Sequence, residues 1–359
     1  MLKQSRSIQH IFQTTKVYTR RKMSSSSSPS PFPKWPKPIH DANGDYRVES
    51  AFLESTLHDS KGHRNTLYEH QTKIPHLPIP SISETLSKLP STALPLLKTK
   101  NSSDNDDERT SFMKAIENFP SQAERLQLQE RLLKRRNEEY KESSWLQHWW
   151  NTTGYLQVRD PVVINVSYFY HFVMDPTLPI HSTGDNLDLS ISRGAAILHQ
   201  VAKFRKEVCS ATLSPPFVGR KEKNTQTFLC NTAYKYMFHT CRIPQLHQDC
   251  VRMYDPSIHD NSHCIVSYKG MFYAVDFVDP NTGDPLPLSI LENRLKRVKD
   301  LVRQNHKTNV KLGWLTSWDR DSWAKGRETL LSVGGKDLEQ ALSKLESGAF
   351  MLCLDDEVR

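Results

Sequence analysis

The amino-acid sequence predicts an α/β fold, because strand-like and helix-like patterns alternate along its second half. In chain order these patterns are an apolar run at residues 161–164, a helical pattern at 194–208, a hairpin pattern at 264–278 and a helical pattern from Ser289. With 359 residues and 37% hydrophobic composition, the chain can bury the core of one large domain or two ordinary ones.

The first 22 residues have the composition of a mitochondrial presequence. They contain no acidic residue, are rich in Ser, Thr and Gln, and place Ile8, Ile11 and Phe12 at helical spacing. They also carry six basic residues: Lys3, Arg6, Lys16, Arg20, Arg21 and Lys22. A disordered basic tail is the alternative. Initiation at Met23 would give a second form without this segment, which we expect to be peroxisomal or cytosolic.

The rest of the chain is close to neutral, since removing these six charges from the net charge of +8 leaves +2 for residues 23–359. This balance argues against nucleic acid as a partner. No window of 18 apolar residues predicts a transmembrane segment. The six cysteines have no paired spacing, so we expect a reducing compartment and no metal site.

Serines and prolines dominate residues 23–48, which we interpret as a disordered linker. Ordered structure should begin somewhere in residues 45–70. Three prolines, Pro75, Pro78 and Pro80, then enforce an extended lead, and Ser81 or Ser83 can cap a helix.

A long amphipathic helix follows, with Ser121 and Glu124 at the spacing of a capping box. Leu126, Leu132 and Leu133 give it an apolar face among densely charged ones. Such a helix needs a partner surface.

The stretch at residues 145–165 contains three tryptophans and then an apolar run, which indicates a helix end turning into a buried strand. Trp145 and Trp149 are four apart and should anchor the core. Trp150 and Tyr155 lie on either side of the expected break at residues 151–154, where aromatic side chains are often partly exposed. An aromatic wall there could hold a cation or a flat group.

The later elements are predicted from local patterns. Lys269-Gly270 separates the two strands of a β-hairpin at residues 264–278. A helix is expected across residues 232–239, and Ser289 with Glu292 should cap another. Beyond it we expect a strand at 312–316, a helix at 337–345 and a strand at 350–354.

Five separated motifs resemble the choline/carnitine acyltransferase family, in the family's order. They are the prolines 75, 78 and 80 with the Glu-Thr-Leu that follows, residues 130–135, the Trp-Trp stretch, the Cys-Arg-Ile-Pro run at 241–244, and Thr316, Arg320, Asp321, Trp323 and Ala324. The family's fold has two halves, each similar to chloramphenicol acetyltransferase, with a tunnel between them. The resemblance implies that residues 137–359 form the first α/β half, and that residues 70–136 are a helical lead packing on a second half.

The resemblance also implies a chemistry, the transfer of an acetyl or short acyl group between coenzyme A and carnitine. In the family a histidine is the base and a Ser/Thr cluster assists the oxyanion. Both are expected beyond Arg359, so we expect no catalytic residue and no activity from this chain alone. Trp150 and Tyr155 match the family's aromatic residues on the carnitine side. No bound cofactor is implied, because coenzyme A is a substrate.

Two other interpretations stay open. His171 and Asp175 match a His-x-x-x-Asp pattern of other acyltransferases, which would make the chain a self-sufficient half-enzyme. A non-catalytic remnant that acts as a binding or regulatory protein is the second. Arg242 and Arg320 could pair the phosphates of coenzyme A, although an arginine at a helix end more often forms a structural ion pair.

Overall fold

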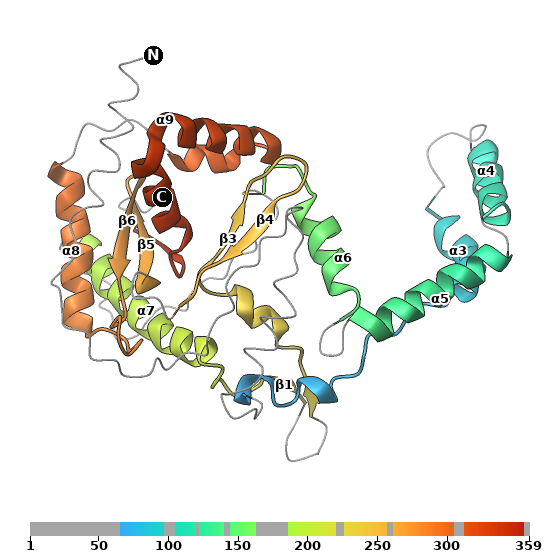
Figure 1. Ribbon diagram of the computed structural model, residues 1–359, viewed down its shortest axis with the longest axis horizontal. Helices are drawn as coiled ribbons and strands as arrows, with labels where there is room; N and C mark the ends of the chain where they lie inside the picture. Colours follow the sequence, from blue (N-terminus) through green and yellow to red (C-terminus); the bar gives the residue numbers. More distant parts are fainter. Residues whose placement is uncertain are drawn as a thin grey trace. The chain divides into compact units, whose positions relative to one another are not determined.

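The computed structural model describes residues 65–96, 105–119, 122–139, 144–162, 186–219, 226–256, 261–304 and 312–354 (Figure 1). These residues form two compact units. One comprises the described part of residues 72–151, and the other combines residues 65–71 with the described residues from 152 onward. A short 3₁₀ turn, η3 (Gln71–Lys73), crosses the division. The predicted presequence, the predicted linker, residues 163–164 of the run at 161–164, and His171 with Asp175 lie outside the described residues.

The first unit is helical, with α3 (Ile82–Ala93), α4 (Asn105–Glu117), α5 (Gln122–Glu139) and the short α6 (Gln147–Asn151). The predicted cap at Ser81 is confirmed, because its hydroxyl accepts a hydrogen bond from the Glu84 amide at 3.2 Å. A hydrogen bond joins α5 to α3, because the side-chain oxygen of Gln129 in α5 accepts from the Ile82 amide at 2.9 Å. One of the unpaired amides of the first turn of α3 is thereby satisfied.

The apolar face predicted for α5 is poorly covered within this unit. Leu126 is 58% exposed, while Leu132 and Leu133 are half-buried. Among the described residues of the unit, Trp145 is the one buried hydrophobic side chain. The unit therefore has a small core of its own.

The second unit contains all the described strands. They are β1 (Phe217–Val218), β2 (Thr227–Phe228), β3 (Thr240–Ile243), β4 (Cys250–Met253), β5 (His263–Tyr268), β6 (Met271–Asp276) and β7 (Met351–Cys353). Its α-helices are α7 (Asn186–Cys209), α8 (Leu288–Gln304) and α9 (Arg320–Glu346). Shorter turns are the 3₁₀ helices η2 (Thr66–Tyr68), η6 (Thr232–Tyr236) and η8 (Leu312–Ser317), and the π-helical η4 (Thr152–Leu156).

The central sheet has the strand order β6-β5-β7. The predicted hairpin is confirmed: β5 and β6 pair antiparallel, and Lys269 and Gly270 both have positive φ, of 49° and 77°. Positive φ at both central residues is the mark of a type I′ turn, whose twist matches that of the strands. The predicted last strand is also confirmed, as β7 pairs parallel to β5. Separate antiparallel pairs are formed by β1 with β2 and by β3 with β4.

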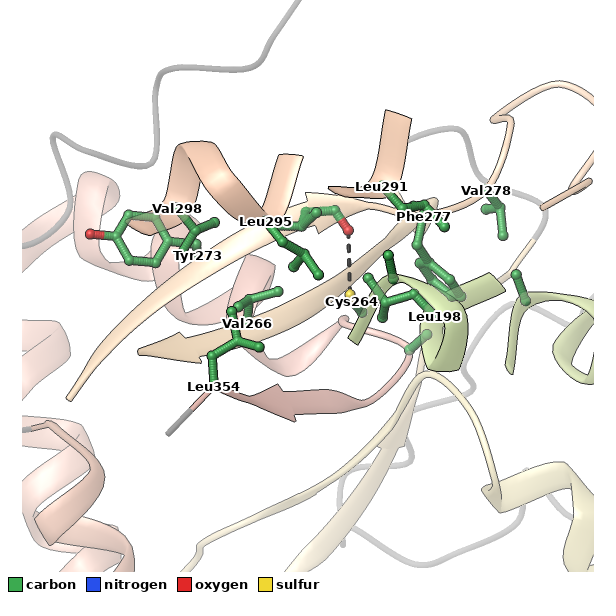
Figure 2. Packing of buried hydrophobic residues seen from close by; sticks show 14 of the residues in the cluster. Leu198, Cys264, Val266, Tyr273, Phe277, Val278, Leu291, Leu295, Val298 and Leu354 are labelled. Carbon is green, nitrogen blue, oxygen red and sulfur yellow. Dashed lines mark hydrogen bonds between the residues drawn. The ribbon is translucent and has the colours of Figure 1, made fainter. Parts of the chain in front are cut away.

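One face of this sheet packs against α7 and α8. Alternate residues of β5 point into this core, as expected for a strand. Figure 2 shows the meeting point, where side chains from both helices and both long strands interlock: Leu198, Leu291, Leu295, Cys264, Val266 and Tyr273. Gly194 permits the close approach of α7, because a Cβ added there would lie 3.2 Å from Leu295. The result is a mixed helix and sheet arrangement consistent with an α/β acyltransferase fold.

Three predicted elements need correction. Residues 312–316 form the 3₁₀ helix η8 and no strand, because the hydroxyls of Thr316 and Ser317 donate to carbonyls three residues back, at 2.6 and 2.7 Å. Ser289 does not cap α8, which begins at Leu288, where Pro287 offers its carbonyl to the Ile290 and Leu291 amides. The helix expected across 232–239 is shorter, since η6 ends at Tyr236.

The helix α9 consists of two helical segments joined at Gly335, whose φ of 57° and ψ of −152° are not helical. The second segment contains the predicted helix at 337–345. The first begins at Arg320, after Asp319 caps it by accepting from the Ser322 amide at 2.9 Å. Arg320 is thereby placed in the first turn of α9, where it takes part in the site described next.

Candidate functional site

The tryptophans of the central stretch lie in the helical unit. The predicted core role is confirmed for Trp145, which is buried and donates its indole N–H to the Leu77 carbonyl at 3.0 Å. It is wrong for Trp149, which is 39% exposed and carries the Arg135 guanidinium 4.0 Å from its ring centre. Trp150 follows on α6 and is 58% exposed. An exposed tryptophan of this size can present its face to a ligand.

Tyr155 lies in the other unit, on the π-helical turn η4 (Thr152–Leu156), and is 48% exposed. At residues 151–154, where the helix was predicted to end, the backbone continues into this rarer helix type. Single π-helical turns occur frequently at functional sites. Because Trp150 and Tyr155 belong to different units, the structure describes each of them separately.

The backbone that follows Tyr155 is attached to the rest of its unit by hydrogen bonds from three residues. The Arg242 guanidinium donates through Nη2 to the Tyr155 carbonyl at 2.7 Å and to the Val158 carbonyl at 3.2 Å. The Asp249 amide donates to the Leu156 carbonyl at 2.9 Å, and the Arg320 amide donates to the Arg159 carbonyl at 2.8 Å. The segment at residues 155–159 is thus bound along its length.

Asp249 is the centre of this attachment, and we call it with its three arginine partners the Asp249 cluster. Its Oδ1 accepts from Arg159 Nη2, and its Oδ2 accepts from the Nε atoms of both Arg242 and Arg320, each at 2.6 Å. The residue is 1% exposed. Burial alone would raise the pKa of Asp249, but the hydrogen bonds from Arg159 and Arg320 lower it below its ordinary value. The carboxylate is therefore charged and holds three cations.

These contacts decide between the two roles considered for Arg242 and Arg320. Both guanidinium groups bind Asp249, so they form a structural ion-pair network, and the Arg242 guanidinium also binds the Tyr155 and Val158 carbonyls. Arg320 is buried as well, which leaves it little room for a phosphate. Asp249 is not among the site residues predicted from the sequence. The signal that could have found it was the presence of an arginine in each of three separate motif-bearing segments, because such arginines need an acidic partner.

A second buried polar pair lies elsewhere in the same unit. Arg205 donates its Nε hydrogen to His239 Nε2 at 2.7 Å, so His239 Nδ1 carries the ring hydrogen and donates it to the Ser347 carbonyl at 2.9 Å. Burial first, and then the Arg205 charge, lower the pKa of His239 well below its usual value. Both ring nitrogens are occupied, and His239 cannot accept a substrate proton in this arrangement. We assign it a structural role.

Within the described ranges, no three His, Cys, Asp or Glu side chains come together as a metal-binding group. His263 is bonded through Nε2 to the Lys344 carbonyl at 2.8 Å. No helix among the described residues is long and apolar enough to cross a membrane.

Comparison with known proteins places this site in a family. Carnitine O-acetyltransferase of Rattus norvegicus is 28% identical over 294 residues, which cover 80% of this chain and 42% of the relative. The mitochondrial carnitine O-acetyltransferase of Saccharomyces cerevisiae is 30% identical over 296 residues, 80% of this chain and 40% of the relative. The liver isoform of human carnitine O-palmitoyltransferase 1 is 24% identical over 295 residues, 82% of this chain and 34% of the relative.

The chain thus spans less than half the length of the curated relatives it matches. The sequence profile of the family described as choline/carnitine O-acyltransferase matches residues 77–359, which include most of both units, the Asp249 cluster, Trp150 and Tyr155. The chain belongs to the choline/carnitine O-acyltransferase family.

Proposed function

We propose that this protein takes part in carnitine O-acyl transfer, moving an acetyl or another short acyl group between coenzyme A and carnitine. Family membership supports the reaction class, and the names of the rat and yeast relatives support the acetyl group. The observation that carries the proposal is the exposed Tyr155 on a π-helical turn whose backbone is held from several sides.

In this proposal Trp150 and Tyr155 border the carnitine. A tryptophan face attracts a quaternary ammonium group through the ring quadrupole, and a phenolic O–H donates to a carboxylate. Carnitine offers both groups. The two side chains would therefore bind and orient the acceptor, without taking part in bond making.

The bond-making groups belong, in this proposal, to a second half. A histidine there takes the carnitine hydroxyl proton, the oxygen attacks the thioester carbonyl, and hydroxyl side chains stabilise the oxyanion. Collapse of the intermediate expels the coenzyme A thiolate, which recovers the proton. Residues 137–359 would be the first α/β half of the fold, similar to chloramphenicol acetyltransferase, and residues 70–136 would pack on the second half.

Mitochondria are the proposed location, on the composition of residues 1–22 and the printed name of the yeast relative. Initiation at Met23 would supply a second form, without the presequence, to the peroxisome or cytosol.

The test is an acyl-transfer assay on the product of the complete reading frame, established by sequencing the transcript through the Arg359 codon. Release of coenzyme A from acetyl-coenzyme A should depend on carnitine. Tyr155→Phe and Trp150→Ala should raise the KM for carnitine by about 3-fold to 30-fold with a smaller effect on kcat, because they remove acceptor binding. Tyr236→Phe and Trp314→Ala are the matched controls.

Three outcomes would contradict the proposal. An equal KM effect in the control variants would remove Trp150 and Tyr155 from the acceptor site. Turnover by the 359-residue chain alone that disappears in His171→Ala would establish the half-enzyme interpretation. A complete protein without any carnitine-dependent release would support the non-catalytic interpretation.

A further inference from the structure

We propose that Asp249 is a positioning residue that fixes the orientation of Tyr155 through the arginines of its cluster. What Tyr155 contacts rests on the proposed function. The coupling between Asp249 and Tyr155 rests on the geometry alone, and can be tested without any substrate.

Asp249 binds the Tyr155 segment in two ways. Its own amide holds the carbonyl of Leu156, the residue next to Tyr155, at 2.9 Å. Its carboxylate holds Arg242, whose guanidinium binds the Tyr155 and Val158 carbonyls, and Arg320, whose amide binds the Arg159 carbonyl. Asp249 comes immediately before β4 (Cys250–Met253), which pairs along its length with β3 (Thr240–Ile243). This pairing fixes the backbone next to Asp249.

Arg242 is the link that reaches Tyr155 directly. A guanidinium group is planar, so fixing its Nε on Asp249 Oδ2 also fixes the direction of Nη2. That nitrogen donates to the carbonyls of Tyr155 and Val158. Removing the negative charge at Asp249 would release this plane, and the Tyr155 carbonyl would lose its fixed donor.

Charge makes the cluster depend on this single carboxylate. Three guanidinium groups converge on Asp249, while another carboxylate, that of Asp321, lies 3.6 Å from Arg159 and also accepts from the His247 amide. Without the Asp249 charge the three cations would repel one another. Arg159 is a member of the bound segment, so its displacement would act directly on residues 155–159.

A second cluster in the same unit supplies a matched control. The Glu346 side chain is 8% exposed, and it accepts two hydrogen bonds from Arg327, at 2.7 and 3.0 Å, with Arg252 at 3.5 Å. It has its own tyrosine reporter, because the Tyr254 hydroxyl donates to it at 3.1 Å. Its side-chain partners lie outside the segment at residues 155–159.

The experiment compares Asp249→Asn with Glu346→Gln in the 359-residue chain labelled with 3-fluorotyrosine. Fluorine NMR follows each tyrosine, with the Tyr155 and Tyr254 signals assigned by their loss in Tyr155→Phe and Tyr254→Phe. Asp249→Asn should shift or broaden the Tyr155 signal and leave that of Tyr254 in place. Glu346→Gln should do the reverse. Amide exchange in residues 152–159 should rise about tenfold or more in Asp249→Asn only.

An unchanged Tyr155 signal in a folded Asp249→Asn protein would overturn the proposal, as would equal changes in both variants. If Asp249→Asn does not fold, Arg242→Lys decides the question. The lysine keeps a positive charge beside Asp249 but cannot bind the aspartate and both carbonyls in one plane. It should move the Tyr155 signal alone, and no change there would also contradict the proposal. A negative result in this experiment would not count against the proposed carnitine binding, because no substrate is present.

Discussion

Individual residues show how this chain offsets the free-energy cost of burying polar and charged groups through hydrogen bonds from neighbouring side chains. His239 is completely enclosed and hydrogen-bonded on both ring nitrogens, beside a buried arginine. A proton added to that ring would remove the acceptor used by Arg205 and place two cations side by side. The neutral ring is therefore part of the folded state.

We predict that His239 makes stability depend on pH. Its pKa lies well below 6.5 in the folded chain and near 6.5 when unfolded. The contribution is complete above about pH 6.5. It is lost as the pH falls below that value toward the folded pKa, because only the unfolded chain binds the proton, at up to about 1.4 kcal/mol per pH unit.

Urea unfolding between about pH 5 and pH 8 measures this dependence. His239→Gln should flatten the acid side of the profile relative to the wild-type protein. His199→Gln, at a half-buried histidine bonded to the Leu286 carbonyl, should retain the slope. An unaltered slope in His239→Gln would show that other groups cause the acid loss.

At this scale the sequence predicts the candidate site only in part. Trp150 and Tyr155 were found because their aromatic side chains stand together in the sequence, and both are exposed in the structure. Asp249 was not found, because two of its partners lie 90 and 71 residues away. A buried ion pair across that separation leaves no local pattern.

Helices and turns could be predicted from the sequence where neighbouring residues determine them. The α3 cap at Ser81 and the turn at Lys269-Gly270 depend on neighbouring residues, and both were predicted. The run at 312–316 was predicted wrongly, because hydroxyl back-bonding competes with the strand and apolarity alone does not reveal it.

We predict opposite effects for glycine-to-alanine changes at two positions of α9. Gly335 joins the two helical segments at a φ of 57° and ψ of −152°, a conformation almost confined to glycine. Gly335→Ala should destabilise the protein by about 1–3 kcal/mol although a Cβ there would meet nothing within 4 Å.

Gly326 is the matched position within a helical segment, where an added Cβ would make ordinary contact with Trp318 at 3.4 Å. Gly326→Ala should be neutral or stabilise by up to about 1 kcal/mol, because alanine favours helix. Chemical denaturation of both variants tests the pair. A stable Gly335→Ala protein would show that α9 can continue as one helix.

At the scale of the whole molecule, two compact units and a basic N-terminal segment lie within one family member. We predict that the full chain is imported by isolated mitochondria and that a chain beginning at Met23 is not. All six charges of the leading segment precede that methionine. Protease protection after import is the measurement. Equal protection of both forms would show that the targeting signal lies elsewhere.

The central claim is that Tyr155, held by the Asp249 cluster, borders the carnitine. Titration of L-carnitine into the 3-fluorotyrosine-labelled chain tests it most directly, with Tyr155 and Tyr254 observed in the same spectra. The account predicts a saturable shift of the Tyr155 signal while the Tyr254 signal stays in place. A Tyr155 signal that carnitine leaves unmoved, or equal drift of both signals, would contradict it.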